Sequence, residues 1–236
     1  MKSKTLDKWF ERHREKGYKK FIYDGIVNED EWEKSDVKVC FFLKEAYLLG
    51  SEESADLCRW LDQGLNKRMW HTVADWIFAL ESVTDSSIPS FDFIPKSDSE
   101  ETARIKSCAI INIKKSDGKP NSEKNDLLDF LKEDSDLIRE QFEEIKPEII
   151  VCGNTAYFFQ IAFGAEVNSK GSLISNAKYN GVEIDRNELG RKGFVSAGDK
   201  LIIDFCHPAN RFDRMGKYYA FSTLYQQALL HNKKNA

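Results

Sequence analysis

Four short apolar runs, separated by stretches with helical spacing, constrain the fold of this 236-residue chain more than any other feature. Each run has the length of a buried strand, and the runs cover residues 37–43, 108–113, 148–152 and 200–205. The amphipathic stretches cover residues 55–65, 70–80, 125–145, 155–163 and 217–230. This alternation predicts an α/β fold, a three-layer αβα sandwich around a central, mainly parallel four-stranded sheet.

Composition indicates a folded chain that does not enter a membrane. Hydrophobic residues make up 41% of it, too many for disorder throughout. No apolar run approaches the ~18 residues needed to span a bilayer, and the charged N-terminus lacks the apolar stretch of a signal peptide. We therefore expect a cytoplasmic protein. The length predicts one domain over residues 37–236, with a helical arm at 1–36 packing outside the sheet.

Two segments interrupt the alternation. Residues 85–102 hold Pro89, Pro95 and many Ser and Asp, which predicts a loop. Residues 168–199 are rich in glycine and contain two stretches of alternating polarity. These predict a small β-hairpin formed by residues 181–184 and 193–196.

The five cysteines are spread singly, with no CxxC or CxxH spacing. Most lie inside or at the end of apolar runs. This pattern favours reduced, buried thiols over a disulfide framework, a zinc site or an iron–sulfur cluster. We expect no metal and no organic cofactor.

A carboxylate, an amide and an imidazole stand at the ends of three predicted strands: Glu45, Asn112 and His207. Ligands of parallel sheets bind beyond the carboxyl ends of the strands, so we expect these side chains to converge on one pocket. The amide can read the polar edge of a pyrimidine, and the carboxylate can orient a water. The imidazole can donate to an oxygen that becomes anionic as a bond breaks. Together they suit displacement of a base from a sugar.

Each of these residues also has an ordinary structural interpretation. Glu45 can cap the next element or pair with Lys44, and Asn112 can close a turn. The dipeptide His207-Pro208 is a common way for a chain to leave a sheet. The residues taken singly leave these alternatives open.

The same segments, in order, resemble motifs of the uracil-DNA glycosylase superfamily. Residues 37–47, VKVCFFLKEAY, are similar to its strand running into Gly-Gln-Asp-Pro-Tyr or Gly-Glu-Ala-Pro. Residues 108–112, CAIIN, resemble its Leu-Leu-Leu-Asn strand, and residues 145–156, IKPEIIVCGNTA, its Lys-Pro strand and helix start. Residues 204–211, DFCHPANR, resemble its His-Pro-Ser motif. The resemblance covers about residues 37–230.

The resemblance implies the same fold and a role for each matched position. Glu45 would position the attacking water, and His207 would stabilise the departing base. The matched substrate-binding positions are Tyr47, Asn112, Gly153 and Asn154. The sequence departs from the family where Leu43-Lys44 replaces a glycine that lies close to the substrate.

Cations and an aromatic residue near two of the motifs imply contact with DNA, although a run of charge is also typical of a solvated surface. The DNA-binding candidates are Lys114, Lys115, Asn210, Arg211, Phe212 and Arg214. Arg211 or Phe212 would take the place of the apolar wedge that fills the vacated base stack. Trp60, Trp70 and Phe91 are candidates for stacking on the base, with core packing as the alternative.

The sequence therefore predicts a monomeric DNA glycosylase-like hydrolase that excises uracil or another modified or deaminated base in base-excision repair. Base flipping would bring the target into the pocket. Two alternatives stay open: a catalytically inactive module of the same fold that binds nucleic acid, a nucleotide or a protein, and an enzyme or binder of small nucleosides.

Overall fold

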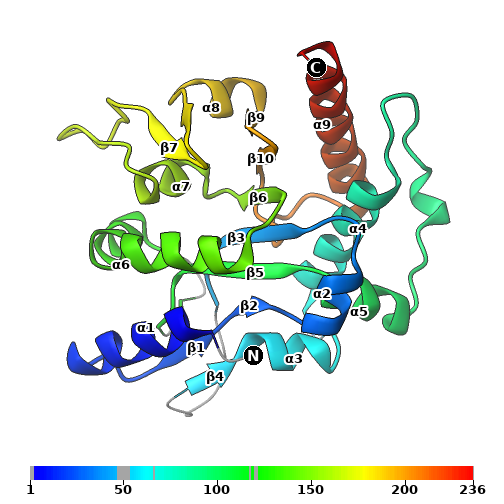
Figure 1. Cartoon of the computed structure of the whole chain (residues 1–236). Coiled ribbons are helices and arrows are strands. Elements are labelled where there is room, and N and C mark those ends of the chain that lie inside the picture. The colour runs from blue at the N-terminus through cyan, green and yellow to red at the C-terminus, as the bar shows by residue number, and fades with distance from the viewer. Residues whose placement is uncertain (1–2, 47–53, 66, 117, 120–121, 236) are drawn as a thin grey trace.

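The computed structural model describes residues 3–46, 54–65, 67–116, 118–119 and 122–235 (Figure 1). Its centre is a six-stranded sheet in the order β2-β5-β3-β6-β10-β9. The strands are β2 (Gly25–Ile26), β3 (Val39–Glu45), β5 (Ala109–Lys114), β6 (Ile149–Gly153), β9 (Phe194–Ala197) and β10 (Lys200–Phe205). The four central strands run parallel, as predicted, while β2 and β9 are antiparallel. The chain is thus an α/β protein with a mixed, mostly parallel sheet, wider than the predicted four strands.

Helices cover both faces of this sheet (Figure 1). One face carries α1 (Lys4–Glu15), α6 (Lys124–Ile145) and α7 (Ala156–Ala162). The other face carries α3 (Leu57–Asp62), α4 (Arg68–Ser82), α5 (Asp98–Lys106) and α9 (Arg214–Asn235). The remaining elements are β1 (Phe21–Tyr23), α2 (Glu29–Lys34), β4 (Ser54–Asp56), the 3-10 helix η1 (Phe91–Phe93), β7 (Ala177–Tyr179), β8 (Val182–Ile184) and α8 (Glu188–Lys192).

The alternation of side chains along β3 explains the two cores. Phe42 points toward α6 and α7, where its ring lies 5.7 Å from Phe142, while Phe41 points to the opposite face and stacks 6.4 Å from Trp76. Successive strand residues face opposite sides, so a central strand covered by helices on both faces is apolar throughout. This is why the four runs could be recognised in the sequence.

The N-terminal arm differs from its prediction, because part of it belongs to the sheet. Gly25 and Ile26 pair with Ile110 and Ala109, so β2 forms one edge. The prediction that the whole arm packs outside the sheet is therefore wrong. Gly25, with φ +124°, adopts a backbone conformation that favours glycine.

The two predicted excursions also contain regular structure. Residues 85–102 end in α5, which begins with a capping box formed by Ser97 and Glu100, so the loop prediction is wrong there. The hairpin pairing is corrected as well, since residues 182–184 pair with 177–179, and residues 194–197 pair with β10. The turn between β7 and β8 is Asn180-Gly181, both with positive φ, which is the sequence preferred in tight hairpins.

Within the described part of the chain, no helix is long and apolar enough to cross a membrane. Cys40, Cys108 and Cys152 are buried, as the sequence predicts, whereas Cys58 and Cys206 are partly exposed.

Candidate functional site

The predicted site residues from four strands lie on one side of the sheet, near the carboxyl ends of the parallel strands. Leu43 lies beside Asn112, and Phe205 lies beside Gly153, because β5, β3, β6 and β10 are parallel and in register there. The strands β3 and β10 are separated by β6 alone, so the backbones that carry Glu45 and His207 are about 10 Å apart. The fold therefore brings both predicted catalytic residues to the same edge.

Glu45 is a buried carboxylate at this end of the sheet. Its side chain is 2% exposed, and the ammonium of Lys114 lies 3.6 Å from its Oε2. Neither carboxylate oxygen has a hydrogen-bond partner among the described residues. A Cβ on Gly118 would lie 2.3 Å from the carbonyl oxygen of Ala46, so only glycine lets this loop close over Glu45. Buried carboxylates need donors, which makes Glu45 suited to holding a polar ligand such as a water.

Asn112 is held by a buried carboxylate that the sequence does not reveal. Asp24 accepts hydrogen bonds from the backbone N–H of Asn112 at 2.7 Å and from its Nδ2 at 3.0 Å. Asp24 also accepts from Lys115 at 2.5 Å and from Gln141 at 2.9 Å. Asn112 is 2% exposed, so its amide serves the interior of the protein in this conformation.

His207 is a neutral hydrogen-bond donor. Burial lowers its pKa to about 4, with further contributions from the positive charges of Lys44 and Lys217. Its Nδ1 accepts a hydrogen bond from the backbone N–H of Ala209 at 3.1 Å. The proton of the neutral ring is therefore on Nε2, which can donate to a ligand.

Hydrogen bonds from the side chain of Lys217 hold the loop that follows His207. The ammonium of Lys217 donates to the carbonyl oxygens of Pro208 at 2.9 Å and Asn210 at 3.2 Å. Burial lowers the pKa of Lys217. Because these bonds fix the loop relative to α9, Lys217 is a positioning residue for His207.

Three of the predicted DNA-binding cations are engaged inside the protein. Lys115 is fully buried against Asp24, and the ammonium of Lys114 lies 2.7 Å from Asp126. The prediction that these two lysines form an exposed basic surface is therefore wrong, because carboxylates distant in sequence compensate them. Arg214 donates to Asp75, at 2.5 and 2.7 Å, and to Glu101, both of which are buried carboxylates.

The remaining candidates of this loop are exposed. Phe212 is 67% exposed, and Arg211 and Asn210 lie beside it on the surface. Phe93 on η1 is 78% exposed, and it is not among the DNA-binding residues predicted from the sequence. The segment 89–91 is joined to α9 by two tyrosines, since the Tyr218 hydroxyl donates to Pro89 and the Tyr219 hydroxyl accepts from the backbone of Phe91.

Gly153 and Asn154 differ in their surroundings. A Cβ on Gly153 would lie 2.6 Å from Cδ2 of Leu43 and 3.3 Å from Pro208, so these two side chains close directly over the glycine. Asn154 is exposed and has φ +58°. The predicted contact of Tyr47 with the base lies outside the described residues.

The three aromatic candidates for base stacking all belong to or pack against the core on the α4 face of the sheet. Trp70 is buried in the core, and Trp60 lies under the ammonium of Lys67, 5.7 Å from the ring centroid. Phe91 packs 5.6 Å from Tyr218.

Among the described residues, no group of three His, Cys, Asp or Glu side chains is placed to hold a metal ion. Sequence reasoning missed Asp24, whose partners Asn112 and Gln141 are 88 and 117 residues away in the sequence. The sequence also places Lys217 among the cations after His207, but its ammonium bonds to backbone carbonyls of that loop. A lone aspartate in the N-terminal arm carries no local signal of this role.

Comparison with known proteins finds no matching family model, no matching curated protein and no matching solved structure.

Proposed function

We propose that this protein hydrolyses the N-glycosidic bond of uracil or another modified or deaminated base in DNA, as the motif resemblance to uracil-DNA glycosylases implies. The observation that carries the proposal is the neutral, desolvated His207, whose Nε2–H can donate at the sheet edge that also bears Glu45. A neutral donor stabilises the anionic oxygen of a departing base without needing to transfer its own proton.

In the proposed reaction the nucleotide is flipped out of the helix, because the bond is inaccessible within the stack. The glycosidic C–N bond breaks and its electron pair passes to the base. His207 donates a hydrogen bond to the resulting anion. A water held by Glu45 adds to the sugar carbon, and its proton passes by way of the carboxylate to the base.

A second candidate is a binding module of this fold without hydrolysis. Two observations favour it: the Asn112 amide is bonded to Asp24, and Leu43 with Pro208 covers Gly153. A base could contact neither position without a rearrangement. Exposed Arg211 and Phe212 would still serve binding to a nucleic acid.

A base-release assay on labelled oligonucleotides, single- and double-stranded, separates the two candidates. The strands carry uracil, hypoxanthine, xanthine or hydroxymethyluracil. We expect release from at least one strand, and about a 10²- to 10³-fold loss in His207→Ala, as for removal of one oxyanion donor. His231→Ala, on α9, is the matched control and should retain activity.

Affinity is measured on the same strands. Binding to the strands without release of a base from any of them would contradict the glycosylase proposal and support the binding module. Release that is equal in wild type and His207→Ala would contradict the assigned role of His207, and absence of both binding and release would overturn both candidates.

A further inference from the structure

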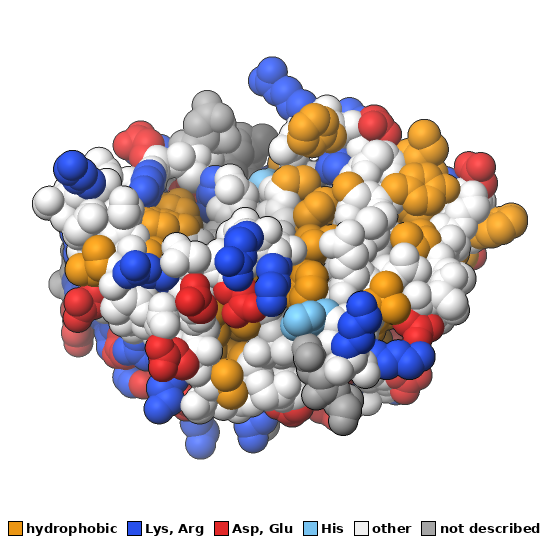
Figure 2. Space-filling model, turned by 90° about the horizontal axis from the view of Figure 1, so that it is seen from above, with side chains coloured by type: hydrophobic (Ala, Val, Ile, Leu, Met, Phe, Trp, Pro, Cys, Tyr) orange, Lys and Arg blue, Asp and Glu red, His pale blue; other side chains and the backbone are white. Residues whose placement is uncertain are grey.

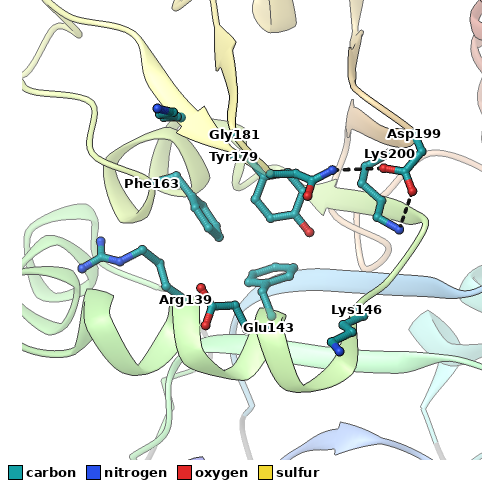
Figure 3. A pocket seen from close by; sticks show the side chains of 11 residues that line it. Arg139, Glu143, Lys146, Phe163, Tyr179, Gly181, Asp199 and Lys200 are labelled. Carbon is teal, nitrogen blue, oxygen red and sulfur yellow. Dashed lines mark hydrogen bonds and ion pairs between the residues drawn. The ribbon is translucent and has the colours of Figure 1, made fainter.

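A groove of about 870 Å³ lies at the opposite end of the sheet from His207. Its walls are the last turns of α6, the β7–β8 hairpin and the turn that precedes β10 (Figure 3). The helix α6 runs antiparallel to the strands, since Asp126 in its first turn reaches Lys114 at the end of β5. Its last turns, with Arg139, and the residue Lys146 that follows them therefore lie at the amino ends of the strands.

Positive charge exceeds negative charge in this groove. Of the charged side chains that line it, Lys200 and Asp199 neutralise each other at 3.1 Å, and Asp199 also accepts from Asn180 at 3.0 Å (Figure 3). Arg139, Lys146 and Lys178 have no carboxylate within ion-pair distance among the described residues, and Glu143 has no such cation. Apart from the Lys200–Asp199 pair, the groove therefore holds three cationic side chains and one carboxylate, that of Glu143, which leaves a net charge of +2.

Arg139, on α6, is held by a hydrogen bond to the neighbouring helix α7. Its Nη1 donates to the carbonyl oxygen of Ala162, at the end of α7, at 2.5 Å. This bond fixes the planar guanidinium at the groove and leaves its other donors available within the described structure. Arginine binds phosphate and carboxylate groups with two parallel hydrogen bonds, which a fixed guanidinium favours.

The floor of the groove is aromatic. The rings of Phe142, Phe163 and Tyr179 contact one another with centroids 4.9 to 6.1 Å apart, and all three line the groove. Figure 3 shows the rings of Phe163 and Tyr179 between Arg139 on one side and Asp199 with Lys200 on the other. Pockets for small molecules combine an apolar lining with a few fixed polar groups, and their volumes are about 300–1,000 Å³.

We propose that this groove binds a phosphate monoester with a flat organic body, of the class of nucleoside monophosphates. The phosphate dianion matches the two excess positive charges and is held by Arg139 and Lys178, and the ring lies on the aromatic floor. The site is independent of the proposed glycosylase, because it lies at the other end of the strands and shares no residue with Glu45 or His207.

Isothermal titration of the full chain with AMP, adenosine and inorganic phosphate tests the proposal. We expect AMP to bind at least tenfold more tightly than adenosine and at least tenfold more tightly than inorganic phosphate. Arg139→Gln and Lys178→Gln should each weaken AMP binding at least fivefold. Lys132→Gln removes the same charge from an exposed position of α6 outside the groove, and it should bind AMP within twofold of wild type.

Two variants are used because Arg139 also bonds to Ala162. Lys178 is exposed, and its side chain forms no hydrogen bond with the residues that the structure describes. Absence of AMP binding at 10 mM would overturn the proposal. So would equal affinity for AMP and adenosine, equal affinity for AMP and phosphate, or an unchanged affinity in Lys178→Gln. Base release by these variants should equal that of wild type, so the two proposals fail separately.

Discussion

Burial sets the ionisation of single residues near the site edge. It lowers the pKa of His207 to about 4 and raises the pKa of Asp204 to about 6, because a poorly solvated environment penalises the charged form of either group. Both side chains are therefore shifted toward neutrality, and each shift can be measured.

The imidazole of His207 should stay neutral down to about pH 5. Lys44→Met removes a positive charge that contributes to this shift, so the pKa of His207 should rise in that variant. Histidine NMR titration measures it, with Lys170→Met in an exposed loop as the matched control. A His207 pKa near 6.5 in wild type would contradict the assignment of a half-buried, poorly solvated and neutral donor.

Asp204 should make stability depend on pH. Its pKa in the folded chain, about 6, exceeds the ordinary 3.8, so the folded state binds the proton more tightly and wild type loses stability as pH rises from about 4 to 6. Asp204→Asn lacks this loss. We expect the stability of Asp204→Asn relative to wild type to be greater at pH 8 than at pH 4, by about 1–3 kcal/mol.

Urea unfolding at the two pH values measures this difference. Asp185→Asn, on the surface between β8 and α8, is the control. An equal effect of Asp204→Asn at both pH values would show that the carboxyl of Asp204 is not desolvated.

Predictability from sequence differed between the residues of the site. The positions of Glu45 and His207 could be predicted because Glu45 ends β3 and His207 follows β10 after one residue, and parallel strands end on the same side of the sheet, whereas Asn112 was predicted to end its strand but lies within β5, which continues to Lys114. The burial of Lys114 and Lys115 could not, because lysines are mostly exposed and the compensating carboxylates come from the N-terminal arm and from α6.

At the scale of elements, α1 is joined to α6 by a row of polar contacts around a buried tryptophan. Lys8 pairs with Glu140 at 2.6 Å, Arg12 with Asp136 at 2.7 Å and Lys16 with Glu133 at 2.8 Å. The pairs recur every four residues along α1, so they lie on one face of the helix. Arg12 lowers the pKa of Asp136 to about 2 through a side-chain hydrogen bond.

Arg12→Gln should destabilise the protein by about 0.5–1 kcal/mol, because it breaks a two-bond contact with a half-exposed carboxylate. Arg14→Gln is the matched control on the same helix, since Arg14 is exposed and its contact with Glu11 is 3.8 Å. That variant should differ from wild type by less than about 0.3 kcal/mol. Thermal unfolding compares them, and equal losses would contradict the specific role of Arg12.

Elements with strong periodicity were predicted well, and those that depend on distant partners were not. The long helix α6 has an apolar face over its whole length and was predicted within one residue. The strand β2 has two residues, and its pairing with β5 is set by contacts 80 or more residues away. Such a short edge strand has no periodicity of its own.

On the scale of the whole molecule, the charge is slightly negative. The net charge is −4, and on the face shown in Figure 2 the Lys and Arg side chains lie among Asp, Glu and hydrophobic ones. If the loop that follows His207 binds DNA, its exposed cation Arg211 contributes, whereas Lys114 and Lys115 are buried. We expect DNA affinity to depend only weakly on salt concentration, because each phosphate contact adds about one unit to the slope of log K against log salt.

Arg211→Gln should lower DNA affinity and reduce the slope of log K against log salt by about one. The exposed Lys132 is the matched control, because Lys132→Gln changes the net charge equally but lies on α6. Fluorescence anisotropy at several salt concentrations measures both slopes. An unchanged slope in Arg211→Gln would remove this residue from the nucleic-acid interface.

The contact between α1 and α6 also orders events during synthesis of the chain. The partners of α1 lie 115 or more residues downstream, and the central strand β3 must wait for β5 and β6. At ~5–20 residues per second a ribosome takes roughly 6–25 s to cover that interval. Throughout this time the face of α1 that carries Lys8 and Arg12 lacks its partner helix, and only β1, where Phe21 lies 5.6 Å from Phe10, is available for packing, so complete docking of α1 is a late step.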